Sequence, residues 1–328
     1  MRHFRFVFAL AILALSTQVT RAQYGFINRQ LKLVIKQQYQ AAGNFHEGLA
    51  AVKQEGKWGY INPLGQYVLQ PQYEEASDFA EGLAPVMKRG KWGYIDKTGK
   101  FVVAPFYDQA RYFQEGLARF KREGRWGYLN PKGQTEIPQQ FEECGDFNES
   151  AAEYRAGKRW GFIDKKGKPF IEAQYEAVRP FSQGMAPVKQ NGLWGYVDKA
   201  GKWVIEPKYP EAYRFSEGLA LVKVGKLYGF VDKSGKLVIE PTYEDGNKFS
   251  EGLAAVKQNG RWGFIDKSNK PIIKFEYEDA FIFVDGLSAV VKDKRAYYVD
   301  KTGRKLATNL YGTVSDFSEG FAVVSRPK

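Results

Sequence analysis

Few side chains in this 328-residue sequence could carry out chemistry on their own. Beyond residue 22 there is one histidine, His46, and one cysteine, Cys144. A catalytic triad or a histidine-based metal site requires more than these two side chains. His46 precedes a Glu-Gly pair where sister segments have serine, and Cys144 lies near a site where sister segments have alanine. We therefore expect a non-catalytic His46 and a buried, structural Cys144.

Carboxylates are the other candidates, and twelve of them recur at two fixed positions. Pairs of them could hydrolyse glycosides, and alternating acids could bind calcium. The first series begins Asp-Lys turns that mostly end in glycine, and the second precedes glycine: Asp96, Asp164, Asp198, Asp232, Asp266, Asp300; Glu47, Glu81, Glu115, Glu217, Glu251, Glu319. An active site is normally a single departure from a repeat, and a lysine beside the only acid disfavours calcium. We expect both series to bond backbone amides, and we predict no catalytic residue, no metal and no cofactor.

Tryptophans could form a stacking platform for sugars or single-stranded nucleic acid. Six of them occupy one repeated strand position: Trp58, Trp92, Trp126, Trp160, Trp194 and Trp262. Only Trp203 lies outside that register. A position that repeats in this way is typical of a hydrophobic core, so we predict that these rings pack between units.

One pair of positions varies from unit to unit, just before a recurrent phenylalanine. Because packing restricts a repeated site to similar residues, the variation indicates side chains that point outwards. The basic and aromatic members form a candidate ligand-binding rim: Arg111, Tyr112, Arg179, Tyr213, Arg214 and Lys248. Arginine and tyrosine together suit an anionic or sugar-like partner. Ordinary loop variation is the alternative interpretation.

A repeat of about 34 residues positions all these side chains. An aromatic-Gly pair begins each of eight units, at residues 24, 58, 92, 126, 160, 194, 228 and 262. We place a ninth unit one residue late, at Tyr297-Tyr298, where the glycine is lost. No segment between units resembles a linker, so residues 23–328 are predicted to form one domain.

Each unit is predicted to contain three β-strands. In the unit around residues 251–273, residues 253–257 and 261–266 flank Asn259-Gly260, a strong signal for a tight hairpin. A second turn follows in segments such as 232–235, and a third strand such as 237–239 is expected to stop at proline. The connection to the next unit is either a helical turn or a short strand.

Both faces of the second strand are largely apolar. Trp92 and Tyr94 lie on one face, and Gly93 and Ile95 on the other. A lone hairpin is marginally stable in water, so neighbouring units must cover both faces.

The residues at 91–108, KWGYIDKTGKFVVAPFYD, and at 193–212, LWGYVDKAGKWVIEPKYPEA, resemble the WG-repeat proteins of bacteria. The resemblance covers nearly all of residues 24–328. Residues 135–138 depart from it, as do Ser150 and the turn Asp293-Lys294. The resemblance implies a β-rich repeat scaffold, commonly exported, with no general enzymatic role.

We expect an all-β tandem array of nine three-stranded antiparallel meanders. Residues 24–28 form a second strand without its hairpin partner, and residues 321–325 form a first strand without its own. Their pairing would close a propeller-like ring and remove two exposed sheet edges. We favour this ring over an open superhelical β-solenoid, although propellers usually have four to eight blades and longer repeats.

The first 22 residues are predicted to be a secretory signal peptide. A basic start with Arg2 and Arg5 precedes ten apolar residues, 6–15, and a small residue precedes Gln23. Ten apolar residues are too few for a transmembrane helix, and no later segment is suitable. Removal of three arginines would lower the formal charge from +12 to +9, scattered along the chain. A single cysteine excludes an intrachain disulfide.

The sequence thus predicts an exported, non-enzymatic binding or scaffold protein of the periplasm or cell surface. Its partner would be a protein, a peptide or an anionic glycan, and export disfavours nucleic acid. A glycan hydrolase or lyase is the second hypothesis, favoured by a lone pocket of mutually perturbed acids in one unit. A purely structural spacer is the third.

Overall fold

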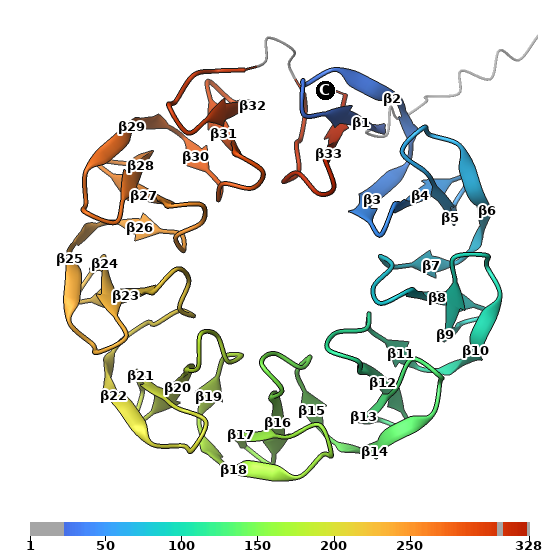
Figure 1. Cartoon of the computed structure of the whole chain (residues 1–328), viewed down its shortest axis with the longest axis horizontal. Coiled ribbons are helices and arrows are strands. Elements are labelled where there is room, and N and C mark those ends of the chain that lie inside the picture. The colour runs from blue at the N-terminus through green and yellow to red at the C-terminus, as the bar shows by residue number, and fades with distance from the viewer. Residues whose placement is uncertain (1–22, 307–310, 327–328) are drawn as a thin grey trace, which may run out of the picture.

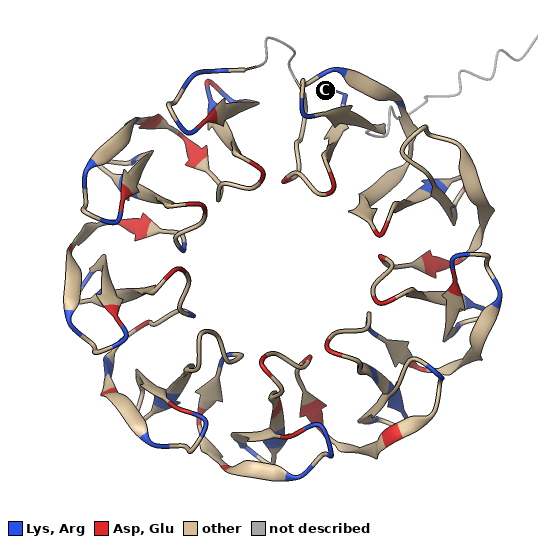
Figure 2. Cartoon of the chain, viewed as in Figure 1, with Lys and Arg blue, Asp and Glu red and all other residues tan. Residues whose placement is uncertain are grey.

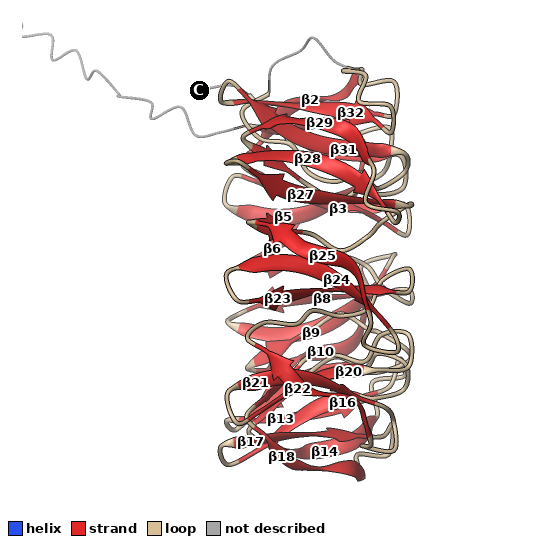
Figure 3. Cartoon of the chain, turned by 90° about the vertical axis from the view of Figure 1, so that its left-hand side faces the viewer, coloured by secondary structure: helices blue, strands red, loops and turns tan. Residues whose placement is uncertain are grey.

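The computed structural model describes residues 23–306 and 311–326 as a closed ring of nine small antiparallel sheets (Figure 1). The described residues contain strands and turns but no helix, so none of them forms a membrane-spanning helix. The favoured ring is confirmed, and the chain is not an open stack. The predicted signal peptide lies outside the described residues. Seen from the side, the strands run across the thickness of the ring and turns line both faces (Figure 3).

Strands occupy four places in a blade, from the centre of the ring outwards. The innermost strands are β3 (Ala41–His46), β7 (Glu75–Ala76), β11 (Gln109–Ala110), β15 (Glu143–Cys144), β19 (Ala177–Val178), β26 (Asp245–Gly246) and β30 (Asp279–Ala280). The second strands are β4 (Leu49–Gln54), β8 (Leu83–Lys88), β12 (Ala118–Arg122), β16 (Ala152–Ala156), β20 (Ala186–Gln190), β23 (Leu219–Val224), β27 (Leu253–Gln258), β31 (Leu287–Lys292) and β33 (Phe321–Ser325).

The third strands carry the repeated aromatic pair: β1 (Tyr24–Asn28), β5 (Lys57–Ile61), β9 (Lys91–Asp96), β13 (Arg125–Leu129), β17 (Arg159–Ile163), β21 (Leu193–Val197), β24 (Leu227–Asp232), β28 (Arg261–Asp266) and β32 (Arg295–Asp300). The outermost strands are β2 (Leu33–Tyr39), β6 (Tyr67–Tyr73), β10 (Phe101–Tyr107), β14 (Thr135–Phe141), β18 (Pro169–Tyr175), β22 (Trp203–Tyr209), β25 (Leu237–Tyr243) and β29 (Pro271–Tyr277). We number the blades 1 to 8 from β4 to β31, and blade 9 combines β33, β1 and β2.

The two ends of the array close the ring. Strand β1 pairs antiparallel with β33 over five residues, from Tyr24 opposite Ser325 to Asn28 opposite Phe321. Each end therefore supplies the hairpin partner that the other lacks. Closure leaves no unit with an uncovered apolar face.

Most blades have one strand more than the three predicted. The connection between units contains a two-residue innermost strand, such as β7, which pairs with β8 through Ala76 and Val86. Six sheets have four strands, and the connection in these is a short strand and not a helical turn. The third predicted strand also continues past its proline. Strand β10 runs through Pro105 to Tyr107, with register shifts that let the proline sit in an irregular stretch of the ladder.

The glycine of the aromatic pair lets the outermost strand approach closely. A Cβ on Gly93 would lie 2.5 Å from the carbonyl oxygen of Val103 and 2.8 Å from the nitrogen of Pro105. Real Cβ atoms do not come this near to backbone. The pair is therefore conserved along the chain for two reasons: the aromatic ring packs between blades, and the glycine admits β10.

Unit nine is in register with the others, contrary to the one-residue delay that the sequence suggested. Ala296 stands opposite Val291, where Trp262 of blade 7 stands opposite Lys257, and the spacing of 34 residues is kept. Tyr297 occupies the glycine position. Among the described residues blade 8 has three strands, and Lys305 and Tyr311 form isolated bridges with Val299 and Ala296 on its outer side.

The core lies between adjacent blades. Tyr94 of blade 2 packs against Phe113 of blade 3, with ring centroids 5.2 Å apart, and its hydroxyl donates to the carbonyl of Arg111 at 2.8 Å. Trp126 and Trp194 are buried, and the other repeated tryptophans are buried or half-buried. The prediction that these rings are core is confirmed, which leaves other residues to form a binding surface.

Candidate functional site

The recurrent glutamates join the blades. They lie in the inner loops, the segments between the first and second strands of a blade, which point towards the centre of the ring (Figure 1). The Glu47 carboxylate of blade 1 accepts the Gly82 amide of blade 2 at 3.0 Å, and Glu319 of blade 9 accepts the Gly48 amide at 2.8 Å. Loop bonding is thus confirmed, and each of these bonds crosses to the next blade.

The recurrent aspartates and their lysines complete the same joint. Asp96 accepts the Thr98 and Lys100 amides within its own turn, which confirms the predicted turn bonding. The hydroxyl of Thr98 and these amides hold the pKa of Asp96 below its usual value. Lys97 reaches back to blade 1, where its Nζ lies 3.2 Å from the Glu47 carboxylate. The repeated acids are therefore occupied by structural bonds.

His46 and Cys144 have structural surroundings. The Nε2 atom of His46 lies 3.5 Å from the Asp78 carboxylate in the next blade. Cys144 is buried, as predicted, and burial raises the pKa of its thiol to about 12, so the reactive thiolate is strongly disfavoured.

Four of the six predicted rim residues line one pocket of about 460 Å³, which we call the basic pocket: Arg179, Tyr213, Arg214 and Lys248. Asp245 and Asn247 complete its polar wall. Tyr112 lines a neighbouring pocket, and exposed Arg111 lines neither. The structure therefore brings together the rim of blades 5 to 7 and leaves Arg111 outside it.

Aromatic rings hold the Arg179 guanidinium in the basic pocket. Its central carbon lies 4.6 Å from the Tyr213 ring centroid and 5.0 Å from that of Trp194. Tyr213 donates its hydroxyl to Glu211 at 3.1 Å, and burial together with this acid raises the pKa of Tyr213 to about 12. The buried Nε of Arg179 has no hydrogen-bond partner among the described residues. A guanidinium that aromatic rings fix in the wall of a pocket is suited to an anionic ligand.

The neighbouring pocket, of about 410 Å³, contains two residues that sequence reasoning missed. We call it the Glu153 pocket. Arg119 and Glu153 occupy a position of the second strand that is apolar in the sister blades: Ala51, Pro85, Pro187, Leu221, Ala255, Ala289 and Val323. A comparison of second strands between units would have found both, because each is a charged departure from an apolar series.

Arg119 is held by the next blade. Its Nε donates to one oxygen of Asp146 at 2.6 Å, its Nη2 lies 3.3 Å from the other oxygen, and its Nη1 donates to the Cys144 carbonyl at 2.5 Å. The bidentate geometry fixes both side chains on the wall of the pocket.

Glu153 is buried at 6% exposure, and its Oε2 atom has no hydrogen-bond partner among the described residues. Burial raises the pKa of this carboxyl to about 7. A Cβ on Gly145 would lie 1.8 Å from Oε2, so blade 4 accommodates the carboxylate only because position 145 is glycine. Glu153, Asp146 and Arg214 line the same pocket.

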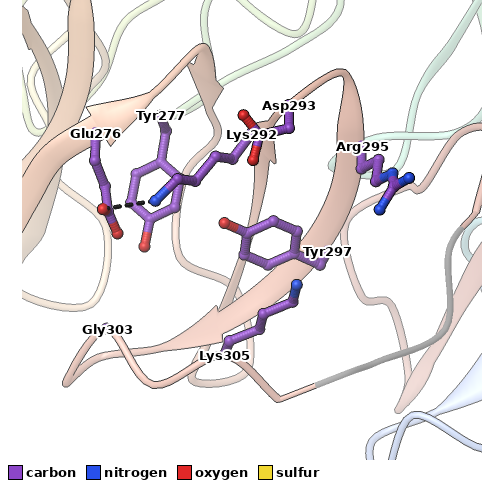
Figure 4. Close-up of a pocket in the computed structure, with 8 residues that line it drawn as sticks. All are labelled: Glu276, Tyr277, Lys292, Asp293, Arg295, Tyr297, Gly303 and Lys305. Carbon is purple, nitrogen blue, oxygen red and sulfur yellow. Dashed lines mark hydrogen bonds and ion pairs between the residues drawn. The ribbon is translucent and has the colours of Figure 1, made fainter.

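A third hollow, of about 350 Å³, lies on the outer side of blade 8 (Figure 4). Tyr297 projects into it, Lys305 stacks 4.1 Å from the Tyr297 ring centroid, and Lys292 pairs with Glu276 at 2.7 Å. This hollow lies between β29 of blade 7 and β32 of blade 8.

Comparison with known proteins places the repeat in a family. The model of the WG containing repeat matches eight successive segments, at residues 24–58, 58–92, 92–126, 126–159, 160–194, 194–228, 228–262 and 262–295. The chain belongs to the WG-repeat family. Among curated proteins, none matches the sequence.

One solved structure shares the fold of this WG-repeat ring with a TM-score above 0.5. A structure described as a eukaryotic initiation factor has a TM-score of 0.63 at 10% identity, covering 94% of this chain and 99% of the other. The C-terminal WD40 domain of Sif2 gives 0.44 at 11% identity, covering 86% and 93%. Hsv2p of Kluyveromyces lactis gives 0.42 at 11% identity, covering 68% and 91%. At these identities the comparison concerns the fold alone.

Charge is distributed unevenly around the WG-repeat ring. Acidic residues mark the loops that point to the centre, and lysines and arginines are frequent along the outer turns (Figure 2). Eight inner loops carry an acid at the position before glycine or its equivalent: Glu47, Glu81, Glu115, Glu149, Glu217, Glu251, Asp285 and Glu319. Blade 5 has Gln183 there, and its Oε1 accepts the Gly218 amide at 2.9 Å. In blade 5 the joint is therefore kept without a negative charge.

Proposed function

We propose that this WG-repeat ring is an exported, non-enzymatic binding protein that holds an anionic group of its partner in the basic pocket. The observation that supports this most is the set of cations on one concave surface. Arg214 and Lys248 are exposed, and neither makes an ion pair with the described residues. Arg179 stands between two aromatic rings beside them.

The surroundings favour an anion over other ligands. A concave surface with several unneutralised cations concentrates the field and attracts negative groups. Arg179 is positioned before the ligand arrives, which reduces the entropy lost on binding.

Export is part of the proposal and is supported by the sequence alone. Residues 1–22 have the basic start, the apolar run and the small residue of a secretory signal. The expected partners are therefore molecules of the periplasm or cell surface, either a protein or peptide or a glycan with acidic groups.

Binding to two soluble polyanions, poly-L-glutamate and polygalacturonate, tests the proposal. We expect the protein to bind at least one of them, more weakly as salt is raised, because exposed charges are screened. The double variant Arg214→Ala/Lys248→Ala should bind about tenfold or more weakly. The matched control Lys158→Ala/Lys226→Ala removes two exposed lysines from hairpin turns and should bind like the wild type. If neither polymer binds, or both double variants lose affinity equally, the basic pocket is not the site.

A glycan hydrolase or lyase is the second candidate, and one observation favours it. Glu153, with its raised pKa, and Asp146 line the pocket of a single unit, and Asp146 itself raises the Glu153 pKa. Two acids with different proton affinities could share general acid and base roles. New reducing ends in polygalacturonate that are lost with Glu153→Gln would establish the enzyme. Unchanged polymer length would leave binding as the function.

A further inference from the structure

We propose that the Glu153 pocket holds a hydroxylated sugar ring, and that the anionic partner of the basic pocket is therefore a glycan containing uronic acid. The inference rests on the proposed function for the acidic part of the ligand. The sugar subsite itself is carried by different residues.

Glu153 departs from the repeat, and packing between the blades does not require a glutamate at this position. Seven sister blades fill its position with small or apolar residues that cover the next blade. A buried carboxyl is costly unless hydrogen bonds satisfy it. Only blade 4 buries a carboxyl at this position, despite the free energy that this costs. Glu153 therefore indicates a role other than holding the nine blades together.

The residues packed against Glu153 leave room for its carboxylate but give its Oε2 atom no hydrogen-bond partner. Gly145 would place any Cβ 1.8 Å from Oε2, so its glycine keeps the carboxylate in place. Phe162 stands opposite Glu153 and packs on Phe181 of blade 5, with ring centroids 4.7 Å apart, so it offers the carboxylate no donor. The buried carboxyl therefore lies in the wall of the pocket with one acceptor oxygen unused.

The remaining wall of the pocket suits a sugar better than an ion. A ligand anion would be repelled by Glu153 and Asp146, and a ligand cation by Arg119 and Arg214. Hydroxyl groups can donate to the acids and accept from the arginines at the same time. Tyr112 adds an exposed ring, at 41% exposure, against which the apolar face of a sugar can stack.

Arg214 connects the two pockets because it lines both. One sugar of a chain would lie against Glu153 and Tyr112, and the carboxylate of an adjacent unit would reach Lys248 and Arg179. A polymer of uronic acid satisfies both requirements when the sugar in the Glu153 pocket presents its hydroxyls there and turns its own carboxylate away from Glu153 and Asp146. A polypeptide with carboxylates satisfies only the second.

The test compares full-length chain on polygalacturonate and on poly-L-glutamate. We expect tighter binding to polygalacturonate. Glu153→Ala, which installs the residue of blades 1, 7 and 8, should weaken polygalacturonate binding about tenfold and leave poly-L-glutamate binding unchanged. Glu153→Gln keeps an acceptor oxygen and should retain most of the affinity. Thermal unfolding shows whether each variant is folded, and we expect Glu153→Ala to be at least as stable as the wild type.

The possible failures are distinguishable. If Glu153→Ala folds and binds polygalacturonate like the wild type, or if poly-L-glutamate binds as well as polygalacturonate, the sugar subsite is wrong and the proposed function remains. If neither polymer binds, the proposed function fails and this inference fails with it.

Discussion

At the scale of single residues, the sites of interest are exceptions to the repeat. Arg119 and Glu153 replace apolar residues in a second strand, and Gln183 replaces an acid. Four of the six residues that the sequence grouped as a rim share a pocket, Arg179, Tyr213, Arg214 and Lys248, and their role in binding stays a prediction. Sequence reasoning missed Glu153 because the strand positions were treated as uniform core. The closeness of Gly145 to Glu153 depends on the pairing of β15 with β16, which no local pattern reveals.

Glu153 predicts how stability depends on pH. Its pKa rises from 4.5 to about 7 on folding, so between these values the folded state binds a proton that the unfolded state releases. Its contribution to stability is present below the unfolded pKa and is lost as pH rises through about 7. The free energy of unfolding of Glu153→Gln, minus that of the wild type, should therefore grow by up to about 3 kcal/mol between pH 5 and pH 8. Urea unfolding at both pH values measures this difference. An equal difference at the two pH values would show that Glu153 is not held in a buried site.

At the scale of strands and turns, the sequence predicted the parts with strong local signals. The hairpin at Asn259-Gly260 and the Asp-Lys-x-Gly turns are where they were expected, because their residues favour those backbone conformations. The two-residue innermost strands were left open, since a strand of that length has no periodicity. The outermost strands were expected to stop at proline, but an edge strand with irregular pairing tolerates proline. In the sequence, the lysine of each turn served only to disfavour calcium binding. Its ion pair with the glutamate of the preceding blade could not be predicted, because it depends on how the blades are arranged in the ring.

The close approach of β9 and β10 leads to a test with a matched control. Gly93→Ala should destabilise the ring by about 2 kcal/mol or more, because its Cβ would meet backbone atoms of Val103 and Pro105 that cannot move independently. Gly43→Ala also lies in a strand, but its Cβ would meet only the end of the Asp78 side chain at 3.0 Å. We expect it to cost less than about 1 kcal/mol. Chemical denaturation of both variants gives the comparison, and equal losses would contradict the packing explanation for the aromatic-Gly pair.

At the scale of the whole molecule, closure makes nine weak units into one structure. Each blade covers its neighbours, and β1 and β33 remove the two edges that an open stack would expose. The sequence predicted the ring because its two ends are complementary halves of a hairpin. It also predicted the number of units, since the spacing of the aromatic pair is regular. What it could not predict was which inner loops converge on a common pocket, because that depends on the curvature of the ring.

Closure predicts a large effect from one buried residue at the seam. Ala322 has no exposed surface and pairs with Ile27 across the junction of β33 and β1. Ala322→Asp should destabilise the ring by about 3 to 5 kcal/mol, because an unpaired charge would be buried between the two ends. Arg326→Asp, at an exposed position next to the same strand, should have little effect. Wild-type stability of Ala322→Asp in urea unfolding would mean that the ends do not meet in solution.

The central claim is that a glycan binds across the Glu153 pocket and the basic pocket, on blades 3 to 7. Hydrogen–deuterium exchange with and without polygalacturonate tests this claim most directly. The account predicts slower exchange on binding in residues 111–119, 145–153, 179–182, 213–221 and 245–248. It predicts no change in residues 293–305, around the outer hollow of blade 8. Protection confined to that outer hollow, or spread evenly over the outer turns, would contradict the account.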